Sequence, residues 1–330
     1  MIRIGILGCG RIGQVHARTL RAMDNAKITA VSDFFPEAAQ NLATHCGTDV
    51  RTTDEIIASD DVDAVIVGTP TDTHFDIIKN ATAAGKAIFC EKPVDMSADN
   101  IRTLITHVEK ANVAFFTAFN RRFDPNFSSV QSRIVGGEIG NVEIVTILSR
   151  DPSPPPIDYV KSSGGLFRDM MIHDFDMARF LLGEDAITIF ATGSALVDPE
   201  IGKVGDVDTA AVTLTTASGK ICQINNSRRA TYGYDQRIEV HGSKGMLRAA
   251  NVLENTVDLA NGDGFQTAPT LNFFLERYEA AYRIEMDRFI AHLSDPSVPI
   301  PTIHDGLAAQ RMADAATLSW ETGQPVTLDT

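Results

Sequence analysis

The strongest constraint on the fold is a glycine-rich segment near the N-terminus. The apolar run at residues 2–7 predicts a short buried strand, and the amphipathic stretch that ends near Leu20 predicts a helix. Between them stands a GxGxxG pattern made of Gly8, Cys9, Gly10, Arg11, Ile12 and Gly13. In such a unit the first glycine permits a tight turn, the second admits a pyrophosphate, and the third lets helix and strand pack closely. Residues 8–13 are therefore predicted to bind a dinucleotide.

The second strand indicates which dinucleotide to expect. It ends at Asp33, about twenty residues after the last glycine, where a carboxylate can accept hydrogen bonds from both ribose hydroxyls. The same carboxylate repels a 2′-phosphate, and no Arg or Lys occurs in the following "FFPE". We expect NAD rather than NADP. The alternative is a glycine-rich turn and a capping Asp without a nucleotide.

Two further strand–helix units and a closing strand follow. Strands are predicted at residues 64–67 and 87–90, and "VAFFTAFNRRFDP" ends the series with a charged turn. Strands that alternate with helices indicate a doubly wound parallel sheet, in which ligands lie at the carboxyl ends of the strands. The residues expected to line the cofactor there are Thr69, Pro70, Thr71, Glu91 and Lys92, and the family resemblance described below implies Asn120 as well. His74 either faces the nicotinamide or packs locally at the start of its helix.

Lys92 follows a strand directly and precedes a proline that restricts its backbone. Its ammonium could stabilise a substrate alkoxide. A surface salt bridge with Glu91 explains the same position equally well.

From about residue 123 the pattern changes, so we predict a Rossmann domain over residues 1–122 and a second domain over 123–330. A Pro- and Gly-rich loop spans residues 152–165. Alternating stretches from "ITIFATGSAL" to "NTVDLANG" predict a large, open-faced, mostly antiparallel sheet with hairpin turns at "ASGK" and "GSKG". The open face is expected to meet solvent or another subunit. Two helices end the chain, and the last could pack back on the first domain.

The segment 164–184 is predicted to form one helix that is apolar around most of its surface. Asp169, His173, Asp176 and Phe180 fall within about 60° of one another on that helix. Buried carboxylates need partners, so this stripe should face other polar groups or a wet cleft. Asp169 beside His173 could orient the imidazole for proton transfer. A helix-capping Asp with a packed core His, or a metal site, are the alternatives.

Composition narrows the class of partner. The chain has 330 residues and a net charge of −14, which discourages binding to nucleic acid and anionic membranes. No apolar run is long enough to span a bilayer, and no secretory leader is recognisable. The four cysteines show no metal-ligand spacing. We expect a cytoplasmic protein without zinc.

Together these motifs resemble the glucose-fructose oxidoreductase, inositol dehydrogenase and rhizopine catabolism (Gfo/Idh/MocA) family. The resemblance is carried by "GILGCGRIGQVHA", "CEKPVDMS", "AFNRRFDPNF", "GGLFRDMMIHDFDMARFLLGE" and "YGYDQRIEVHGSKGM". Within the family, "SRDPSPPPIDYVKSSGG" looks like the bacterial inositol dehydrogenases. The resemblance implies NAD-dependent oxidation of a cyclitol, first of all myo-inositol at C2, in a dimer or tetramer built through the open sheet face.

The resemblance also assigns roles to residues. It implies that Lys92, Asp169 and His173 form the catalytic triad, with His173 or Lys92 as the base. Polyol contacts are implied for Asn120, Arg121, Asp151 and Tyr234, with Tyr278 as a weaker candidate. Other readings remain: oxidation of scyllo-inositol, chiro-inositol or an aldose, an NAD-dependent glycosidase, or a non-catalytic NAD or sugar sensor.

Overall fold

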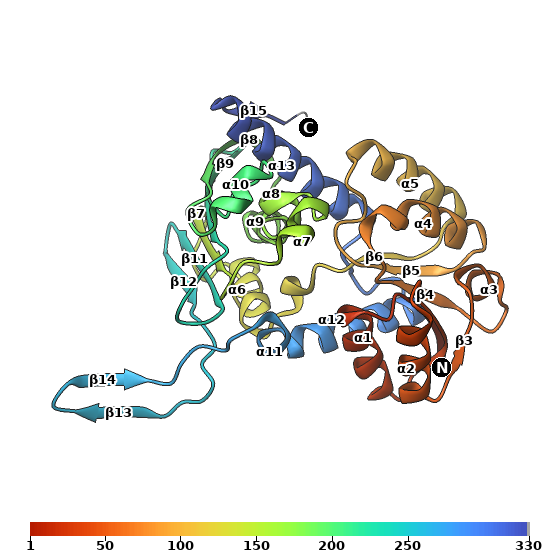
Figure 1. The fold of residues 1–330 in the computed structure, drawn as a ribbon. Helices are drawn as coiled ribbons and strands as arrows, with labels where there is room; N and C mark the ends of the chain where they lie inside the picture. Colours follow the sequence, from red (N-terminus) through yellow and green to blue (C-terminus); the bar gives the residue numbers. More distant parts are fainter. Residues whose placement is uncertain (329–330) are drawn as a thin grey trace. The chain divides into compact units, whose positions relative to one another are not determined.

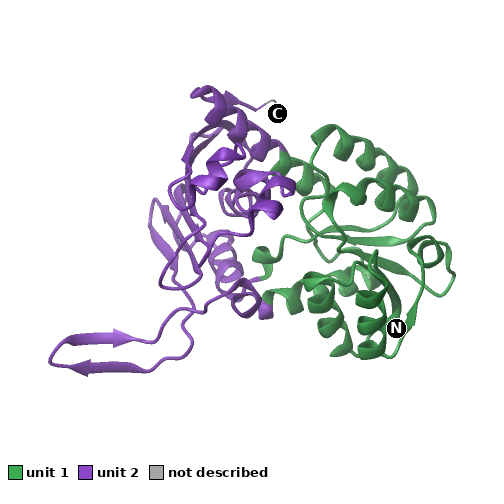
Figure 2. Ribbon diagram, viewed as in Figure 1, with its two compact units in different colours: residues 1–123, 281–310 green, residues 124–280, 311–330 purple. Residues whose placement is uncertain are grey.

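The computed structural model describes residues 1–328, which divide into two compact units (Figure 2). The first unit comprises residues 1–123 and 281–310, and the second comprises 124–280 and 311–330. The sequence-based division had placed residues 281–310 with the second domain. No helix in the described part of the chain combines the length and hydropathy needed to cross a bilayer.

The first unit is built on a six-stranded parallel sheet with the order β3-β2-β1-β4-β5-β6 (Figure 1). Its strands are β1(Ile2–Leu7), β2(Ala26–Ser32), β3(Asp49–Val50), β4(Ala64–Val67), β5(Ala87–Cys90) and β6(Phe115–Thr117). Its helices are α1(Arg11–Arg21), α2(Pro36–Cys46), α3(Thr53–Ala58), α4(His74–Ala83) and α5(Ala98–Ala111), with the 3-10 turns η1(Thr71–Thr73) and η2(Asn120–Phe123). This is the predicted Rossmann order, in which the chain reverses direction across the sheet between β1 and β4.

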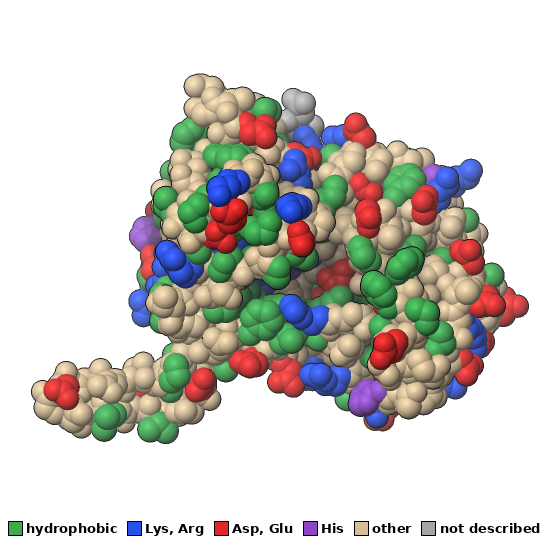
Figure 3. Space-filling model, viewed as in Figure 1, with side chains coloured by type: hydrophobic (Ala, Val, Ile, Leu, Met, Phe, Trp, Pro, Cys, Tyr) green, Lys and Arg blue, Asp and Glu red, His purple; other side chains and the backbone are tan. Residues whose placement is uncertain are grey.

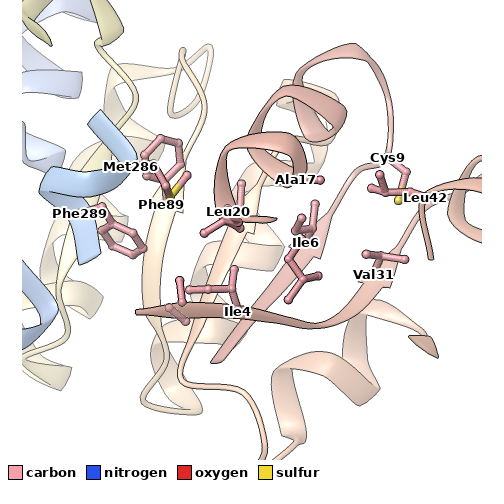
Figure 4. Packing of buried hydrophobic residues seen from close by; sticks show 14 of the residues in the cluster. Ile4, Ile6, Cys9, Ala17, Leu20, Val31, Leu42, Phe89, Met286 and Phe289 are labelled. Atoms are coloured by element: carbon pink, nitrogen blue, oxygen red, sulfur yellow. The ribbon is translucent and has the colours of Figure 1, made fainter. Parts of the chain in front are cut away.

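A late helix completes the core of the first unit. In α12(Glu279–Ser294), Met286 and Phe289 are fully buried in the same apolar cluster as Phe89 of β5 (Figure 4). The rings of Phe89 and Phe289 meet edge to face at 5.5 Å between centroids. The burial of these side chains explains why residues 281–310 belong with the Rossmann unit although they lie far along the chain.

The second unit contains a seven-stranded sheet with the order β12-β11-β7-β10-β9-β8-β15. Its strands are β7(Val142–Arg150), β8(Ala186–Ser194), β9(Thr209–Thr216), β10(Ile221–Ser227), β11(Asp235–Gly242), β12(Gly245–Ala249) and β15(Val326–Thr327). Its helical segments are α6(Pro125–Val135), α7(Ile157–Ser162), α8(Gly165–Asp169), α9(Ile172–Leu182), α10(Pro199–Lys203) and α11(Phe274–Arg277); α13(Ile303–Thr322) begins in the first unit and ends in the second. Only β7 and β10 pair in parallel in this sheet as described, so the prediction of a mostly antiparallel sheet is confirmed.

Three local predictions meet different outcomes. The turns "ASGK" and "GSKG" join β9 to β10 and β11 to β12, as expected. The stretch "NTVDLANG" is not part of the large sheet: β13(Asp258–Asn261) pairs with β14(Gly264–Thr267) in a separate hairpin. Apolar side chains stand on the surface of this hairpin (Figure 3), including Phe265 and Leu259. The predicted loop 152–165 contains the short helix α7.

Candidate active site

The glycine-rich turn has the geometry that a dinucleotide requires. Gly8 has a φ of +98°, and a side chain there would meet the backbone of Gly68 at 2.5 Å. A Cβ on Gly13 would lie 1.9 Å from the carbonyl oxygen of Gly8, so only glycine lets α1 approach the turn. Beside Gly10, by contrast, the space is open to 4 Å. That opening, at the N-terminus of α1, fits a pyrophosphate.

Asp33 is fixed at the end of β2 by the turn itself. Its two carboxylate oxygens accept hydrogen bonds from the backbone N–H groups of Cys9, at 2.6 Å, and Phe35, at 2.8 Å. Burial, together with the Asp33 charge, raises the pKa of the Cys9 thiol to about 12, so that thiol stays neutral. Phe34 follows directly and is 90% exposed. An acidic group braced by the turn, with no cation next to it in sequence, suits a free ribose diol better than a 2′-phosphate.

The other predicted cofactor residues follow the carboxyl ends of the parallel strands. Thr69, Pro70 and Thr71 follow β4, which neighbours β1 in the sheet. The Thr69 hydroxyl bonds that of Thr73 at 2.7 Å, and this bond holds the turn at the start of η1. Asn120 is buried at the beginning of η2, and its side-chain oxygen has no hydrogen-bond partner within residues 1–328. Arg121 is buried beside it.

His74 is packed inside the first unit. It is 1% exposed, and its ring nitrogens lie 3.0 Å from the carbonyl oxygen of Thr69 and 3.1 Å from that of Pro93. Burial lowers the pKa of His74. The ring therefore packs between the turn after β4 and the turn after β5, which agrees with local packing, while a contact with the nicotinamide stays a prediction.

The turn after β5 carries Glu91 and Lys92. The Glu91 carboxylate lies 2.7 Å from Nε2 of His16, a fully buried residue of α1. The Glu91 backbone N–H also donates to the carbonyl oxygen of Val67 in β4. Lys92 is partly exposed. The turn is thus anchored to α1 and β4 directly before the lysine.

The predicted single helix over residues 164–184 is wrong. The chain forms α8 and α9 with a break at Met170 and Met171. The backbone N–H groups of both methionines donate to the carbonyl oxygen of Leu166, and a new helix starts where Asp174 and Phe175 bond Met171. Asp169 therefore ends one helix, and His173 lies in the first turn of the next.

The predicted burial pattern survives this break. The residues expected to be apolar and buried are so: Met170, Met171, Ile172, Phe175, Met177, Ala178, Leu181 and Leu182. Asp169, His173 and Phe180 are partly exposed, whereas Asp176 is 1% exposed. Asp169 and His173 thus remain open to a ligand, while Asp176 belongs to the interior.

Asp169 has two partners that the sequence did not indicate. Its Oδ1 accepts a hydrogen bond of 2.9 Å from the hydroxyl of Tyr159, which α7 delivers. Its Oδ2 lies 3.4 Å from both Nη1 and Nη2 of Arg228, whose side chain is only 2% exposed. The sequence contains one signal for the pair with Arg228: two consecutive arginines stand directly after a strand. A buried arginine needs a carboxylate partner, so an acidic residue near this position could have been expected.

The residue after His173 fixes α9 to the sheet. Asp174 is fully buried and accepts hydrogen bonds from Ser149 of β7, at 2.7 Å, and Asn226 of β10, at 2.9 Å. Buried polar groups that are fully paired hold an element in one position. His173 therefore projects from a rigidly seated helix.

The remaining polyol candidates also lie in the second unit. Asp151 directly follows β7, and its backbone N–H donates to Ser227. Tyr234 precedes β11, and its ring meets that of Tyr278 edge to face at 6.0 Å. Tyr278 is 2% exposed and donates to the side-chain oxygen of Gln236. Their contact with a polyol stays a prediction.

Two models of one protein family together match almost the whole chain. The Gfo/Idh/MocA "Oxidoreductase family, NAD-binding Rossmann fold" matches residues 2–119, and the family's "C-terminal alpha/beta domain" matches residues 131–328. An inositol 2-dehydrogenase of Rhizobium meliloti is 52% identical over 96% of this chain and 96% of its own. A myo-inositol 2-dehydrogenase of Thermotoga maritima is 44% identical over 99% of each.

Solved structures of inositol dehydrogenases are also similar to this chain over nearly its whole length. The structure of a putative myo-inositol dehydrogenase from Sinorhizobium meliloti has a TM-score of 0.97 and 50% identity, with 100% of both chains covered. A scyllo-inositol dehydrogenase from Lactobacillus casei with bound NAD(H) and scyllo-inositol has a TM-score of 0.93 and 29% identity, with 99% of each chain covered.

Proposed function

Because this chain belongs to the Gfo/Idh/MocA oxidoreductase family, we propose that it oxidises myo-inositol at C2 to scyllo-inosose with NAD. The observation that carries the proposal is the 52% identity to an inositol 2-dehydrogenase over 96% of both chains. The braced Asp33 and the open space at Gly10 support NAD as the cofactor. When bound, NAD supplies the hydride acceptor for the reaction.

We assign the proton chemistry to Lys92, Asp169 and His173. His173 takes the proton of the reacting hydroxyl, since its ring is partly open and its helix is seated by Asp174. Asp169, held by Tyr159 and Arg228, orients that imidazole. The Lys92 ammonium holds the substrate oxygen and stabilises negative charge as the proton leaves.

Recognition of the polyol needs several donors and acceptors. We assign this role to Asn120, Arg121, Asp151 and Tyr234. The amide oxygen of Asn120, buried without a partner in the described structure, supports its assignment, because buried polar atoms are nearly always paired when a ligand is in place.

The second candidate function is oxidation of scyllo-inositol, since a structural relative binds that isomer. A panel of inositol isomers and aldoses, assayed for NADH formation with NAD and NADP in parallel, separates the two. Fastest turnover of myo-inositol supports the proposal, and faster turnover of scyllo-inositol replaces it with the alternative.

We also propose that the protein works in the cytoplasm as a homo-oligomer, in which the open face of the seven-stranded sheet joins the copies. All four cysteines are free, as a reducing compartment requires. Phe190, Ile221 and Met246 are exposed large apolar residues of three strands of this sheet. Sedimentation of the wild type and of Phe190→Glu tests the assembly; a monomeric wild type contradicts it.

A further inference from the structure

The first unit contains a buried carboxyl group that the proposed chemistry does not use. Glu285 of α12 is fully buried, and neither carboxyl oxygen has a hydrogen-bond partner among residues 1–328. Nδ1 of His16, also fully buried, lacks a partner in the same part of the chain. Unpaired buried polar groups are rare enough that each needs an explanation.

These groups belong to one neighbourhood. Tyr282, Glu285 and Phe289 are spaced three and four residues apart, so they share one face of α12. The Tyr282 ring meets the His16 ring at 6.1 Å, and the Phe289 ring meets Phe89 at 5.5 Å. Since His16 and Phe89 themselves touch at 4.9 Å, the face of α12 that carries Glu285 packs against these two rings.

Burial and a neighbouring negative charge favour the neutral form of the Glu285 carboxyl. Burial raises the pKa of its carboxyl well above the usual range, and the negative charge of Glu91 raises that pKa further. A neutral carboxyl offers one O–H donor and one carbonyl acceptor. His16 donates through Nε2 to the Glu91 carboxylate, and in a neutral imidazole this makes Nδ1 an acceptor. The O–H of Glu285 and Nδ1 of His16 thus have complementary hydrogen-bonding roles.

We propose that Glu285 is a positioning residue for Lys92, which it holds through an internal water, His16 and Glu91. The water accepts from the Glu285 O–H and donates to Nδ1 of His16, so that both of these buried groups gain a hydrogen-bond partner. His16 then fixes the Glu91 side chain, and Glu91 fixes the turn that presents Lys92. Because His16 lies in α1, which starts at the glycine-rich turn, the same contacts connect the phosphate-binding turn to the lysine.

The test compares two substitutions at Glu285, and its kinetic part rests on the proposed function. Glu285→Gln keeps a donor and an acceptor, so kcat should stay within about threefold of the wild type. Glu285→Met fills the space without hydrogen bonds, so kcat should fall about tenfold or more while the KM for NAD stays within about twofold. His16→Phe keeps the ring packing but loses the bond to Glu91, and the same loss of kcat is expected.

Thr82→Val is the matched control, because its buried hydroxyl also lacks a partner in the described residues but belongs to α4. It should leave kcat unchanged. Thermal unfolding of each variant separates misfolding from repositioning: Glu285→Met should unfold no lower than the wild type. A wild-type kcat in Glu285→Met and His16→Phe overturns the proposal, and so does a Glu285→Gln variant that is as slow as Glu285→Met.

Crystal structures make the test independent of the substrate. The wild type should show a water within hydrogen-bond distance of Glu285 and Nδ1 of His16, and Glu285→Met should show a displaced Glu91–Lys92 turn. Density without that water, or an unmoved turn, contradicts the proposal. If the wild type is inactive on every inositol, but its crystals show the water and those of Glu285→Met show the displaced turn, the proposed function is overturned and the positioning role stays supported.

Discussion

Arg228 lies against Asp169 with both terminal guanidinium nitrogens 3.4 Å from Oδ2, and its side chain is almost completely buried. The arginine directly follows β10, and Asp169 ends α8. Tyr159 holds the other carboxylate oxygen from α7. A neighbouring helix and an arginine 59 residues along the chain thus fix the carboxylate that we assign to orienting His173.

Arg228→Met tests this arrangement. The substitution keeps much of the buried volume but removes the cation, so Asp169 loses its ion pair and keeps the hydrogen bond from Tyr159. We expect kcat to fall about tenfold, equivalent to about 1.4 kcal/mol of transition-state stabilisation. The exposed neighbour provides the control: Arg229→Met should keep the wild-type kcat. Equal kcat values for the two variants would show that Asp169 does not depend on Arg228.

His173→Ala separates catalysis from binding. The imidazole is assigned to proton removal and not to the cofactor, so turnover should be lost while NAD affinity stays within about twofold. Steady-state NADH formation measures the first quantity, and calorimetric titration with NAD measures the second. Retained turnover would reject His173 as the base, and inactivity of both variant and wild type would favour a sensor.

The pair Asp33→Ser and Phe34→Arg tests the choice of cofactor. Removing the carboxylate ends the repulsion of a 2′-phosphate, and the exposed position 34 gives an arginine room to bind it. The ratio of kcat/KM for NADP to that for NAD should rise at least about tenfold. Phe35→Arg alone, which keeps Asp33, is the control and should keep the preference for NAD. An unchanged ratio in the double variant refutes the role of Asp33.

His74 makes stability depend on pH in a defined direction. Burial lowers the pKa of His74 in the folded protein below its ordinary value of 6.5. Below pH 6.5 the unfolded chain therefore binds a proton that the folded chain does not, and the free energy of unfolding falls as pH falls.

Denaturant unfolding of the wild type and of His74→Asn checks this dependence. As the pH falls from about one unit above 6.5 to about one unit below it, the wild type should lose more free energy of unfolding than the variant. Parallel losses in both proteins would show that His74 is protonated equally in the folded and unfolded chains.

Much of the first unit could be predicted because its apolar runs and glycine-rich turn each specify the local structure that the chain adopts. The strands at residues 2–7, 64–67 and 87–90 and the start of α4 at His74 occur where the apolar runs predict them. The glycine roles could also be predicted, because steric limits on a Cβ depend on a short turn that the sequence contains whole.

The errors concern backbone hydrogen bonds and tertiary contacts, which side-chain periodicity does not specify. The pattern of apolar side chains over residues 164–184 is the same for one helix as for two. The break at Met170 and Met171 depends on backbone hydrogen bonds to Leu166, which this pattern does not report. Residues 281–310 belong to the first unit because Met286 and Phe289 are buried in the same apolar cluster as Phe89. The partners of Asp169 were missed for the same reason, as periodicity does not specify long-range pairing.

The most direct test of the proposed function is the rate of NADH formation by the wild-type protein with NAD across the inositol isomers and the common aldoses. The account predicts that myo-inositol gives the highest kcat/KM, that NADP supports at most about a tenth of the rate with NAD, and that scyllo-inosose is the product. No NADH formation with any inositol would contradict it.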